Sequence, residues 1–539
     1  MIAPLPWIQT YDPLGSPWLS TLAAALPIVL LLAALGILEW RAHRAALLGL
    51  IAAVGVSTVV FGMPARTALT TAVYGAAYGF LPIGWIVLNA VFLYSLTVET
   101  GQFEILRTSV GRLSSDRRIQ ALLVAFSFGA IGTPILTLGA VTGIPAKTLG
   151  VMAGRQLPFV SLIVPAWLVV TMSGWRGLRG VWPAVVVCGT SFAVVQFAWS
   201  NYVGVELVDI AGGLASIGAL ALFCRVWQPK DRWESAAVAA VRPQQAVVTS
   251  DRDFRTGAPS VPEIENRDLA LSSSRAVRRA WMPWLFLSIA VIVWGLPATK
   301  AALAGPILAP TWNVPAVHKT IFRDYPVVAA RGDPARIADP ASASAHAEAA
   351  PFTLNWASAT GTAILLAAIA SAIYLRVSVA QFISVAIATF RRMRAPLATI
   401  MLMLALGFVT RYGGTDATLG LAFTRTGWLY PFFGTLLGWL GVALTGSDTS
   451  SNVLFGSLQK ITAQQLGFNP VLVCTANSTG GVMGKMIDAQ SIVVSTASTG
   501  QSGQEGRILR FVFWHSVALA AIMGAIVMLQ AYVFPWMIP

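Results

Sequence analysis

Residues 427–452 read GWLYPFFGTLLGWLGVALTG followed by SDTSSN, so a long apolar run passes directly into a short polar one. An α-helix rises ~1.5 Å per residue, and ~20 apolar residues therefore cross the ~30 Å hydrocarbon core of a membrane. The run 427–446 predicts a membrane-spanning helix, and the polar residues after it predict a break in that helix at membrane depth.

Similar apolar runs recur along the whole chain. Of its 539 residues, 56% are apolar and 11% are charged, roughly half the charged share of an ordinary soluble domain. We expect about twelve membrane-crossing segments, at residues 18–40, 45–62, 81–100, 119–141, 157–173, 180–200, 205–226, 280–296, 356–375, 396–410, 427–446 and 512–535. Two shorter elements are expected at 377–390 and 471–495. The predicted fold class is an all-α polytopic membrane protein.

The formal net charge of +14 fits this class. Lys and Arg accumulate in the cytoplasmic loops of membrane proteins. Loop 101–118, turn 174–179 and segment 225–279 are rich in Lys and Arg, whereas 201–206 contains neither. This alternation predicts an N-terminus outside the cell and segment 225–279 in the cytoplasm. The basic charge therefore gives no reason to expect a nucleic-acid partner.

The residue types that form metal and catalytic sites are not arranged for either task. Cys188, Cys224 and Cys474 stand alone in apolar sequence, and the four histidines form no HExxH spacing. A phosphate-binding loop of the form GxxxxGKS/T is absent, which argues against ATP-driven pumping. We expect no metal, no cofactor and no catalytic residue, and hence no enzyme.

Two polar stretches divide the chain into membrane halves. Residues 227–279 mix charges with Pro, Ser and Ala and are predicted to form a cytoplasmic linker, and 299–354 an extracytoplasmic loop. A single span at 280–298 lies between them. The first membrane half is 1–226, and the second, which carries the polar motifs, is 355–539.

The two halves share an internal repeat. A shift of 352 positions places residues 129–160 on 481–512, where nine of 32 positions agree, five of them in the heptads GRQLPFV (154–160) and GRILRFV (506–512). Chance likeness between apolar segments is the alternative, but the shared heptad favours a repeat. Repeated halves are typical of secondary transporters, whose substrate binds near the midplane between them.

The repeat also reveals an absence. Before Gly481 the second half has a Gly-, Ser- and Thr-rich region at 446–480, whereas the first half has nothing equivalent before Gly129. One of two symmetry-related segments is therefore expected to be missing near residue 130.

The polar stretch at 447–452 and the nearby Asn477 are the best candidates for a substrate site. Non-helical backbone at membrane depth is tolerated only where it is buried in protein or lines a watery cavity. Such breaks present helix N-termini, with unpaired N–H groups, to an anion. We expect Ser447–Asn452 and Asn477–Lys485 to approach each other around a polar cavity near the midplane, as parts of broken or re-entrant segments. Asp448 could carry a proton, or it could cap the helix that begins near Thr449.

Lys485 is a second charged candidate, since it is the only Lys after Lys460. Its ammonium could bind the carboxylate of a substrate. Alternatively, it could pair with Asp448 or Asp488 for purely structural reasons. Arg155 and Arg507, which the repeat relates, are more simply interfacial anchors.

Several of these motifs together resemble the bacterial lactate/glycolate permease family. The motifs are GSDTSSNVLF at 446–455, NSTGGVMGKMI at 477–487, TGQFE at 100–104, GRQLPF at 154–159, GWRG at 174–177 and WPAVV at 182–186. The resemblance implies symport of a 2-hydroxymonocarboxylate, typically lactate, with a proton across the bacterial inner membrane. We assign proton coupling to Asp448. The expected substrate-binding residues are Ser447, Thr449, Ser450, Ser451, Asn452, Asn477 and Lys485.

The chain departs from the family pattern in two places. The resemblance implies about 45 further residues between Gly129-Ala130 and Gly132, at the junction that the repeat indicates, and this sequence lacks them. Asp488-Ala489 stands where the family usually has Ser-Pro. An impaired or inactive family member is therefore one alternative to an active permease. A membrane-embedded sensor or enzyme is another, although the 227–279 linker is too polar and too short for a signalling domain.

Overall fold

The computed structural model describes residues 7–38, 40–103, 105, 116, 118–119, 121–122, 132–204, 208–229, 274–324, 327, 347–499, 501 and 503–539. Most of the predicted linker, part of the predicted outer loop and the junction at 129–131 lie outside these residues.

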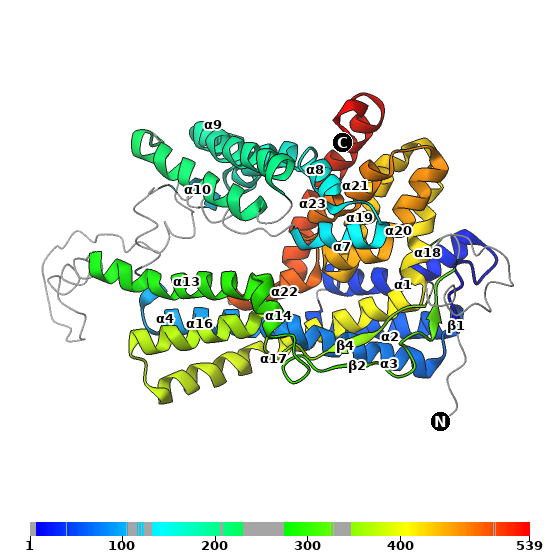
Figure 1. Ribbon diagram of the computed structural model, residues 1–539, viewed down its shortest axis with the longest axis horizontal. Helices are drawn as coiled ribbons and strands as arrows, with labels where there is room; N and C mark the ends of the chain where they lie inside the picture. Colours follow the sequence, from blue (N-terminus) through cyan, green and yellow to red (C-terminus); the bar gives the residue numbers. More distant parts are fainter. Residues whose placement is uncertain are drawn as a thin grey trace, which may run out of the picture.

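The described chain is almost entirely helical (Figure 1). The helices before the linker are α1 (Pro17–Gly36), α2 (Ala42–Gly55), α3 (Ala65–Tyr78), α4 (Trp85–Glu99), α7 (Gly132–Thr142), α8 (Ala146–Ala153), α9 (Leu157–Ala198) and α10 (Val208–Val226). After it come α13 (Ser274–Gly295), α14 (Pro297–Ala302), α16 (Thr360–Leu375), α17 (Val379–Tyr412), α18 (Thr415–Thr424), α19 (Tyr430–Thr445), α20 (Asp448–Leu466), α21 (Pro470–Gly484), α22 (Ala489–Thr499) and α23 (Glu505–Tyr532). Short π-helices follow α2, α3 and α9, at Val56–Val60, Gly79–Gly84 and Trp199–Val203.

The prediction of an all-α polytopic membrane protein is confirmed. Eight helices of the described part are long and apolar enough to cross a membrane, and 211–226 and 360–375 are shorter apolar helices. The expected spans 157–173 and 180–200 meet at Gly174, whose φ of 69° bends α9 between them. The span expected at 119–141 is only partly described.

Three details of the prediction are wrong. The elements expected at 377–390 and 396–410 form one helix, α17, because the exposed Arg391, Arg392 and Arg394 let it continue past the apolar run. The short element expected at 471–495 is two helices, α21 and α22, separated at 485–488. Helices α3 and α18 were not expected. Threonines such as the buried Thr71 and Thr418 interrupt their apolar residues, so neither helix contains a long apolar run.

A small group of strands, here called the cap, packs against α3 and the end of α17. Strand β1 (Trp7–Ile8) pairs in parallel with β3 (Ile321–Phe322), and β2 (Thr311–Asn313) pairs antiparallel with β4 (Pro351–Thr353). The hydroxyl of Tyr74 donates to the Pro351 carbonyl at 2.9 Å, and that of Tyr412 to the Ala349 carbonyl at 3.1 Å. The cap is thereby fixed to α3 and to the end of α17.

Glu348 is the charged centre of this cap. Its carboxylate pairs with Arg323 and, at 3.2 Å, with Arg411 at the end of α17. Burial alone would raise the pKa of Glu348, but the two guanidinium groups beside it hold that pKa below its ordinary value. Glu348 therefore remains a carboxylate and engages Arg411.

The core of the second half is built on glycine. At Gly438 of α19 an added Cβ would lie 1.9 Å from the carbonyl oxygen of Asn477 in α21, and at Gly480 it would lie 2.1 Å from that of Thr435. At Gly484 it would lie 2.3 Å from the Trp439 carbonyl. Helices α19 and α21 thus touch backbone to backbone, as small residues allow in membrane bundles.

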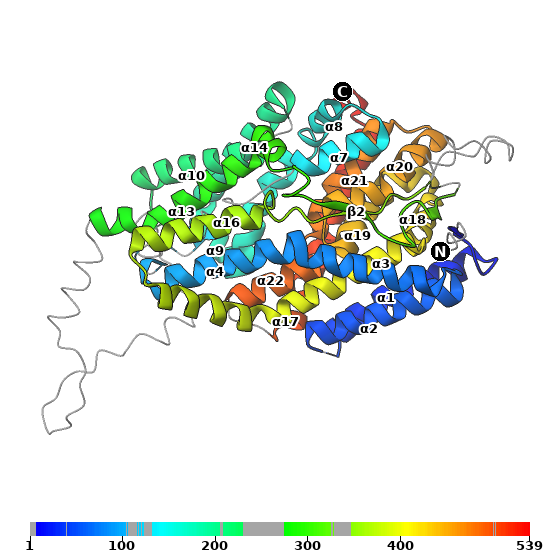
Figure 2. The same cartoon turned by 60° about the horizontal axis from the view of Figure 1, so that its bottom comes forward.

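The first half packs onto this pair. Figures 1 and 2 show α7 beside α20 and α21, and α8 also packs against α21. The shared apolar core includes Ile135, Leu138 and Met152 from the first half and Leu472 and Met483 from α21. Both halves therefore enclose the region where α19 passes into α20.

We predict that Gly438→Ala destabilises the protein strongly. The new methyl group would overlap the Asn477 carbonyl, and overpacking costs about 1–3 kcal/mol. Gly218→Ala in α10 is the control, because an added Cβ there meets nothing within 4 Å. Thermal unfolding of the purified variants in detergent measures the difference. Equal unfolding temperatures for the two variants would contradict this packing.

Candidate functional site

The candidate site is the turn between α19 and α20. Gly446 ends α19 with a left-handed φ of 67°, which favours glycine. A Cβ there would also lie 2.7 Å from Oδ1 of Asp488. Ser447 then begins α20 as its N-cap, and its Oγ accepts a hydrogen bond from the Ser450 N–H at 3.3 Å. The break predicted after the apolar run is present, and it is a single tight turn.

Asp448 lies in the first turn of α20. The Ser478 hydroxyl donates to Asp448 Oδ2 at 2.6 Å. The other oxygen, Oδ1, is buried and accepts no hydrogen bond from any residue that the structure describes. It lies against Gly481, where an added Cβ would come within 2.4 Å of it. The hypothesis that Asp448 caps the helix is wrong, because Ser447 does so.

A buried amide network forms the floor of the site. The Nδ2 of Asn477 donates to Oδ1 of Asn452 at 2.9 Å, and Nδ2 of Asn452 donates to the Ser478 hydroxyl at 3.2 Å. Gln459 Nε2 donates to Oδ1 of Asn477 at 3.0 Å. Ser451 donates to the carbonyl of Gly438 at 3.2 Å. The expected approach of the two polar segments is therefore present, as direct hydrogen bonds between α20 and α21.

The described part of the first half supplies further hydrogen bonds to this region. Asn452 Nδ2 also donates to the Pro134 carbonyl at 3.1 Å, and Thr479 donates to Oε1 of Gln156 at 2.8 Å. Lys460 Nζ donates to the Thr142 carbonyl at 2.6 Å. Helix α7, its last residue Thr142 and the N-cap of α9, Gln156, thus complete the polar interior that α20 and α21 begin.

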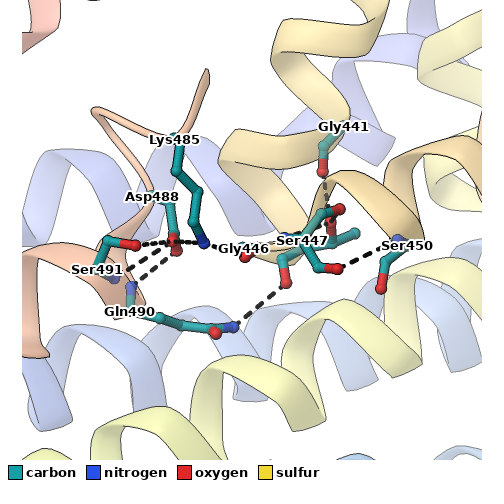
Figure 3. A network of polar contacts seen from close by, with 9 residues as sticks. Gly441, Gly446, Ser447, Ser450, Lys485, Asp488, Gln490 and Ser491 are labelled. Carbon is teal, nitrogen blue, oxygen red and sulfur yellow. Dashed lines mark hydrogen bonds and ion pairs between the residues drawn. The ribbon is translucent and has the colours of Figure 1, made fainter. Parts of the chain in front are cut away.

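Lys485 lies on the other side of the turn (Figure 3). Its Nζ donates to the Gly446 carbonyl at 2.5 Å and to Asp488 Oδ2 at 2.9 Å. Asp488 also accepts from the backbone N–H of Gln490 and from the Ser491 hydroxyl. Of the two ion pairs that the sequence left open, the structure contains the one with Asp488.

The expected residues divide into a rim and a floor. Ser447, Asp448, Thr449 and Ser450 are half-buried, and the Lys485 side chain is 52% exposed; these five form the rim. The buried floor comprises Ser451, Asn452 and Asn477, whose exposed fractions are at most 1%. A rim with an ammonium group, hydroxyls and a helix N-terminus can bind a small polar anion.

Sequence reasoning missed several polar partners of this site. Gln459 is seven residues after Asn452 and therefore lies on the same face of α20, so helical periodicity could have found it. Gln156 belongs to the repeated heptad at 154–160. Ser478 adjoins Asn477, but nothing in the sequence distinguishes it from its neighbours.

No metal centre is found in the described ranges, where no three His, Cys, Asp or Glu side chains converge.

A cleft of about 480 Å³ lies elsewhere, between residues 8–12, the start of α1 and helix α18. We call it the N-terminal cleft. It is lined by Gln9, Tyr11, Asp324, Thr418 and Arg425 among others.

A sequence model of L-lactate permease matches residues 20–129 and 126–534 of the chain. The chain belongs to the L-lactate permease family. It is 40% identical to the glycolate permease GlcA of Escherichia coli strain K12 over 99% of both chains. It is 39% identical to the L-lactate permease of that strain and 38% identical to that of Bacillus subtilis strain 168, over 99% of this chain and 100% of each relative. Family membership and the apolar helices identify a multi-pass bacterial membrane protein.

Among solved structures, the chain is similar to the YdaH transporter of Alcanivorax borkumensis, with 14% sequence identity, a TM-score of 0.27 and coverage of 86% and 87% of the two chains.

The same comparisons bear on the segment expected to be missing. The family model matches in two parts that meet at residues 126–129. The alignments with the permeases named above run over 581, 586 and 589 positions, more than the 539 residues of this chain. These permeases therefore carry residues that this chain lacks, and the match is interrupted at the junction that the repeat indicates.

We predict that Asn477→Ala destabilises the chain, because it leaves Oδ1 of Asn452 buried without its donor. A buried polar group left unsatisfied costs about 1–3 kcal/mol. Gln464→Ala, at an exposed position of the same helix pair, is the control. Thermal unfolding in detergent compares the two variants, and an unchanged midpoint for Asn477→Ala would show that the network contributes nothing.

Proposed function

We propose that this protein imports lactate or a similar 2-hydroxymonocarboxylate, such as glycolate, together with protons. Membership of the L-lactate permease family supports a transporter, and the named relatives include lactate and glycolate permeases. The observation that carries the proposal is the rim, where a helix N-terminus, hydroxyls, a carboxylate and the half-exposed Lys485 adjoin one another beside Gly446.

The rim offers complementary groups for each part of such a substrate. The ammonium of Lys485 and the N–H groups at the start of α20 would bind the carboxylate. The hydroxyls of Ser447, Thr449 and Ser450 would bond the 2-hydroxyl group. The floor residues Ser451, Asn452 and Asn477 would hold α20 against α21, so that the rim keeps its geometry.

Asp448 would couple the proton to the substrate. An ionised Asp448 on the rim repels a second carboxylate, because like charges close together disfavour each other. Protonation removes that repulsion, so the anion and the proton would bind together. The oxygen of Asp448 that has no described partner is available for the proton.

We predict that Asp448→Asn abolishes proton-driven accumulation of lactate while exchange of internal for external lactate continues. The amide cannot ionise, so the carrier would no longer release a proton with each substrate. Uptake of labelled lactate into vesicles that contain the purified chain, with and without an imposed proton gradient, measures both activities. Full accumulation by Asp448→Asn would exclude Asp448 as the coupling residue, and no lactate transport by the unaltered chain would refute the proposed function.

We predict that Lys485→Ala weakens the affinity for lactate by roughly ten- to hundredfold, since a hydrogen bond to a charged group is worth about 1.5–3 kcal/mol. Asp488→Asn is the matched variant, because it releases Lys485 from its ion pair. If Lys485 binds substrate, Asp488→Asn should preserve or tighten the affinity. Equal losses in both variants would indicate a structural pair instead, and the KM for uptake distinguishes these outcomes.

An impaired transporter is the second candidate, and the two-part family match supports it. We predict that the chain transports lactate much more slowly than a version in which the corresponding segment of the Escherichia coli L-lactate permease is inserted at 129–132. The inserted segment would restore the symmetry-related part of the site. Equal rates of uptake would show that the segment is dispensable and that the second half binds lactate by itself.

The same proposal includes the orientation and the division of the chain. We place 227–279 in the cytoplasm and 299–354 outside, with membrane halves at 1–226 and 355–539 and a single span at 280–298 between the two polar stretches. The Lys and Arg bias of the loops supports this arrangement. Labelling of a cysteine introduced at position 250 by an impermeant reagent in intact cells would contradict it.

We propose transport and not catalysis or sensing, because the family is one of permeases.

A further inference from the structure

Asp416 is a second acidic residue inside the helix bundle, separate from the rim. It lies in the first turn of α18 and is fully buried, with an exposed fraction of 0%. The Thr410 hydroxyl of α17 lies beside its carboxylate, but neither oxygen accepts a hydrogen bond of regular geometry in the described part of the chain. An ionised carboxylate is very costly to bury without partners. Such a group is expected to be protonated, or to become so readily.

A second unpartnered group lies at the same turn. Ser57, in the π-helix Val56–Val60, is fully buried, and its hydroxyl has no described partner. An added Cβ at Gly413, three residues before Asp416, would lie 2.4 Å from that hydroxyl oxygen. Thr415 donates to the Thr410 carbonyl at 3.0 Å across the same turn. The turn 413–416 is therefore buried and polar, and it has spare hydrogen-bonding capacity.

The charged neighbours of Asp416 do not neutralise it. At the end of α17, Arg411 pairs with Glu348, and the Tyr412 hydroxyl donates to the Ala349 carbonyl. Helix α1, which packs against α18, has no Asp, Glu, Lys, Arg or His. Of the other packed helices, α19 offers only Tyr430, α20 offers Asp448 and Lys460, and Lys460 is bonded to Thr142. On the side of the cap, Tyr11 and Asp12 are the titratable groups of the N-terminal segment.

The turn 413–416 adjoins the N-terminal cleft. Gln9 lines that cleft, and its side chain donates to the carbonyl oxygens of Arg411 and Tyr412. A Cβ at Gly414 would meet the Cβ of Gln9 at 3.4 Å. Thr418, two residues after Asp416, also lines the cleft. Figure 1 shows α18 beside this N-terminal segment. The Gln9 side chain therefore contacts both the turn and the cleft.

On its other side, the same segment adjoins the rim. A Cβ at Gly407, one turn before Thr410 on α17, would meet the Leu444 carbonyl at 3.8 Å and the Thr445 Cα at 3.9 Å. These two residues end α19, directly before Gly446 and Asp448. The end of α17 thus connects the surroundings of Asp416 to those of Asp448.

We propose that Asp416 is a second proton-binding residue of this transporter, which takes up protons from the N-terminal cleft and passes them toward Asp448. The inference rests on the proposed proton-coupled transport. In each step a proton binds a carboxylate oxygen of Asp416 and later leaves it for a water molecule or a hydroxyl group. No other bond is made or broken.

The first test does not depend on transport. Dicyclohexylcarbodiimide reacts with protonated carboxyl groups in apolar surroundings, and mass spectrometry locates the adduct in the purified, lipid-reconstituted chain. We expect modification at Asp416 that declines as the pH rises. Asp116, which is buried but paired with Arg118 at 2.5 Å, is the internal control and should stay unmodified. An unmodified Asp416 across the pH range would overturn the proposal.

The second test compares Asp416→Asn with Asp416→Glu in vesicle uptake. The amide variant should lose lactate accumulation driven by a proton gradient but keep lactate exchange, whereas the glutamate variant should keep both. Glu99→Gln, at an exposed carboxylate at the end of α4, should change neither. Accumulation by Asp416→Asn at the rate of the unaltered chain would overturn the proposal. If the unaltered chain carries no lactate at all, the proposed function fails, and the carbodiimide result still decides whether Asp416 binds protons.

Discussion

The contact between the backbones of α19 and α21 is the constraint on which the rest of this architecture depends. The carbonyl oxygen of Asn477 occupies the space that a side chain at position 438 would need. This close approach places Ser478 within hydrogen-bonding distance of Asp448 and Asn477 within reach of Asn452. A wider separation of the two helices would leave these polar groups buried without partners. Each unsatisfied group inside a membrane costs free energy of folding.

Because the α19–α21 contact buries some polar groups and leaves others near the surface, the rim and the floor have different roles. The floor satisfies its hydrogen bonds internally and therefore fixes α20 against α21. The rim keeps unsatisfied or exposed groups, namely one oxygen of Asp448 and the ammonium of Lys485. Substrates bind to groups that are not already satisfied, so function is expected at the rim and rigidity at the floor. Asp416 extends this logic, since both of its carboxylate oxygens, like Oδ1 of Asp448, are buried and accept no hydrogen bond in the described part of the chain.

The sequence predicts those parts of the fold in which apolar residues run uninterrupted. The span 427–446 coincides with α19 and its short leading turn because lipid demands an apolar surface over that length. The sequence does not reveal helices such as α3 and α18, whose threonines face other helices and not lipid. It likewise shows that residues 447–452 and 477–485 are polar and must be buried together. Which of the possible partners a side chain takes, such as Asp488 and not Asp448 for Lys485, depends on the geometry of the turn between α21 and α22.

The central claim is that the substrate binds at the turn between α19 and α20. Cryo-electron microscopy of the chain in lipid nanodiscs with saturating lactate tests it most directly. The account predicts density for one lactate molecule beside Gly446, with its carboxylate toward Lys485 and the start of α20 and its hydroxyl toward Ser447 or Ser450. Lactate density confined to the N-terminal cleft, with the turn unchanged and unoccupied, would contradict it.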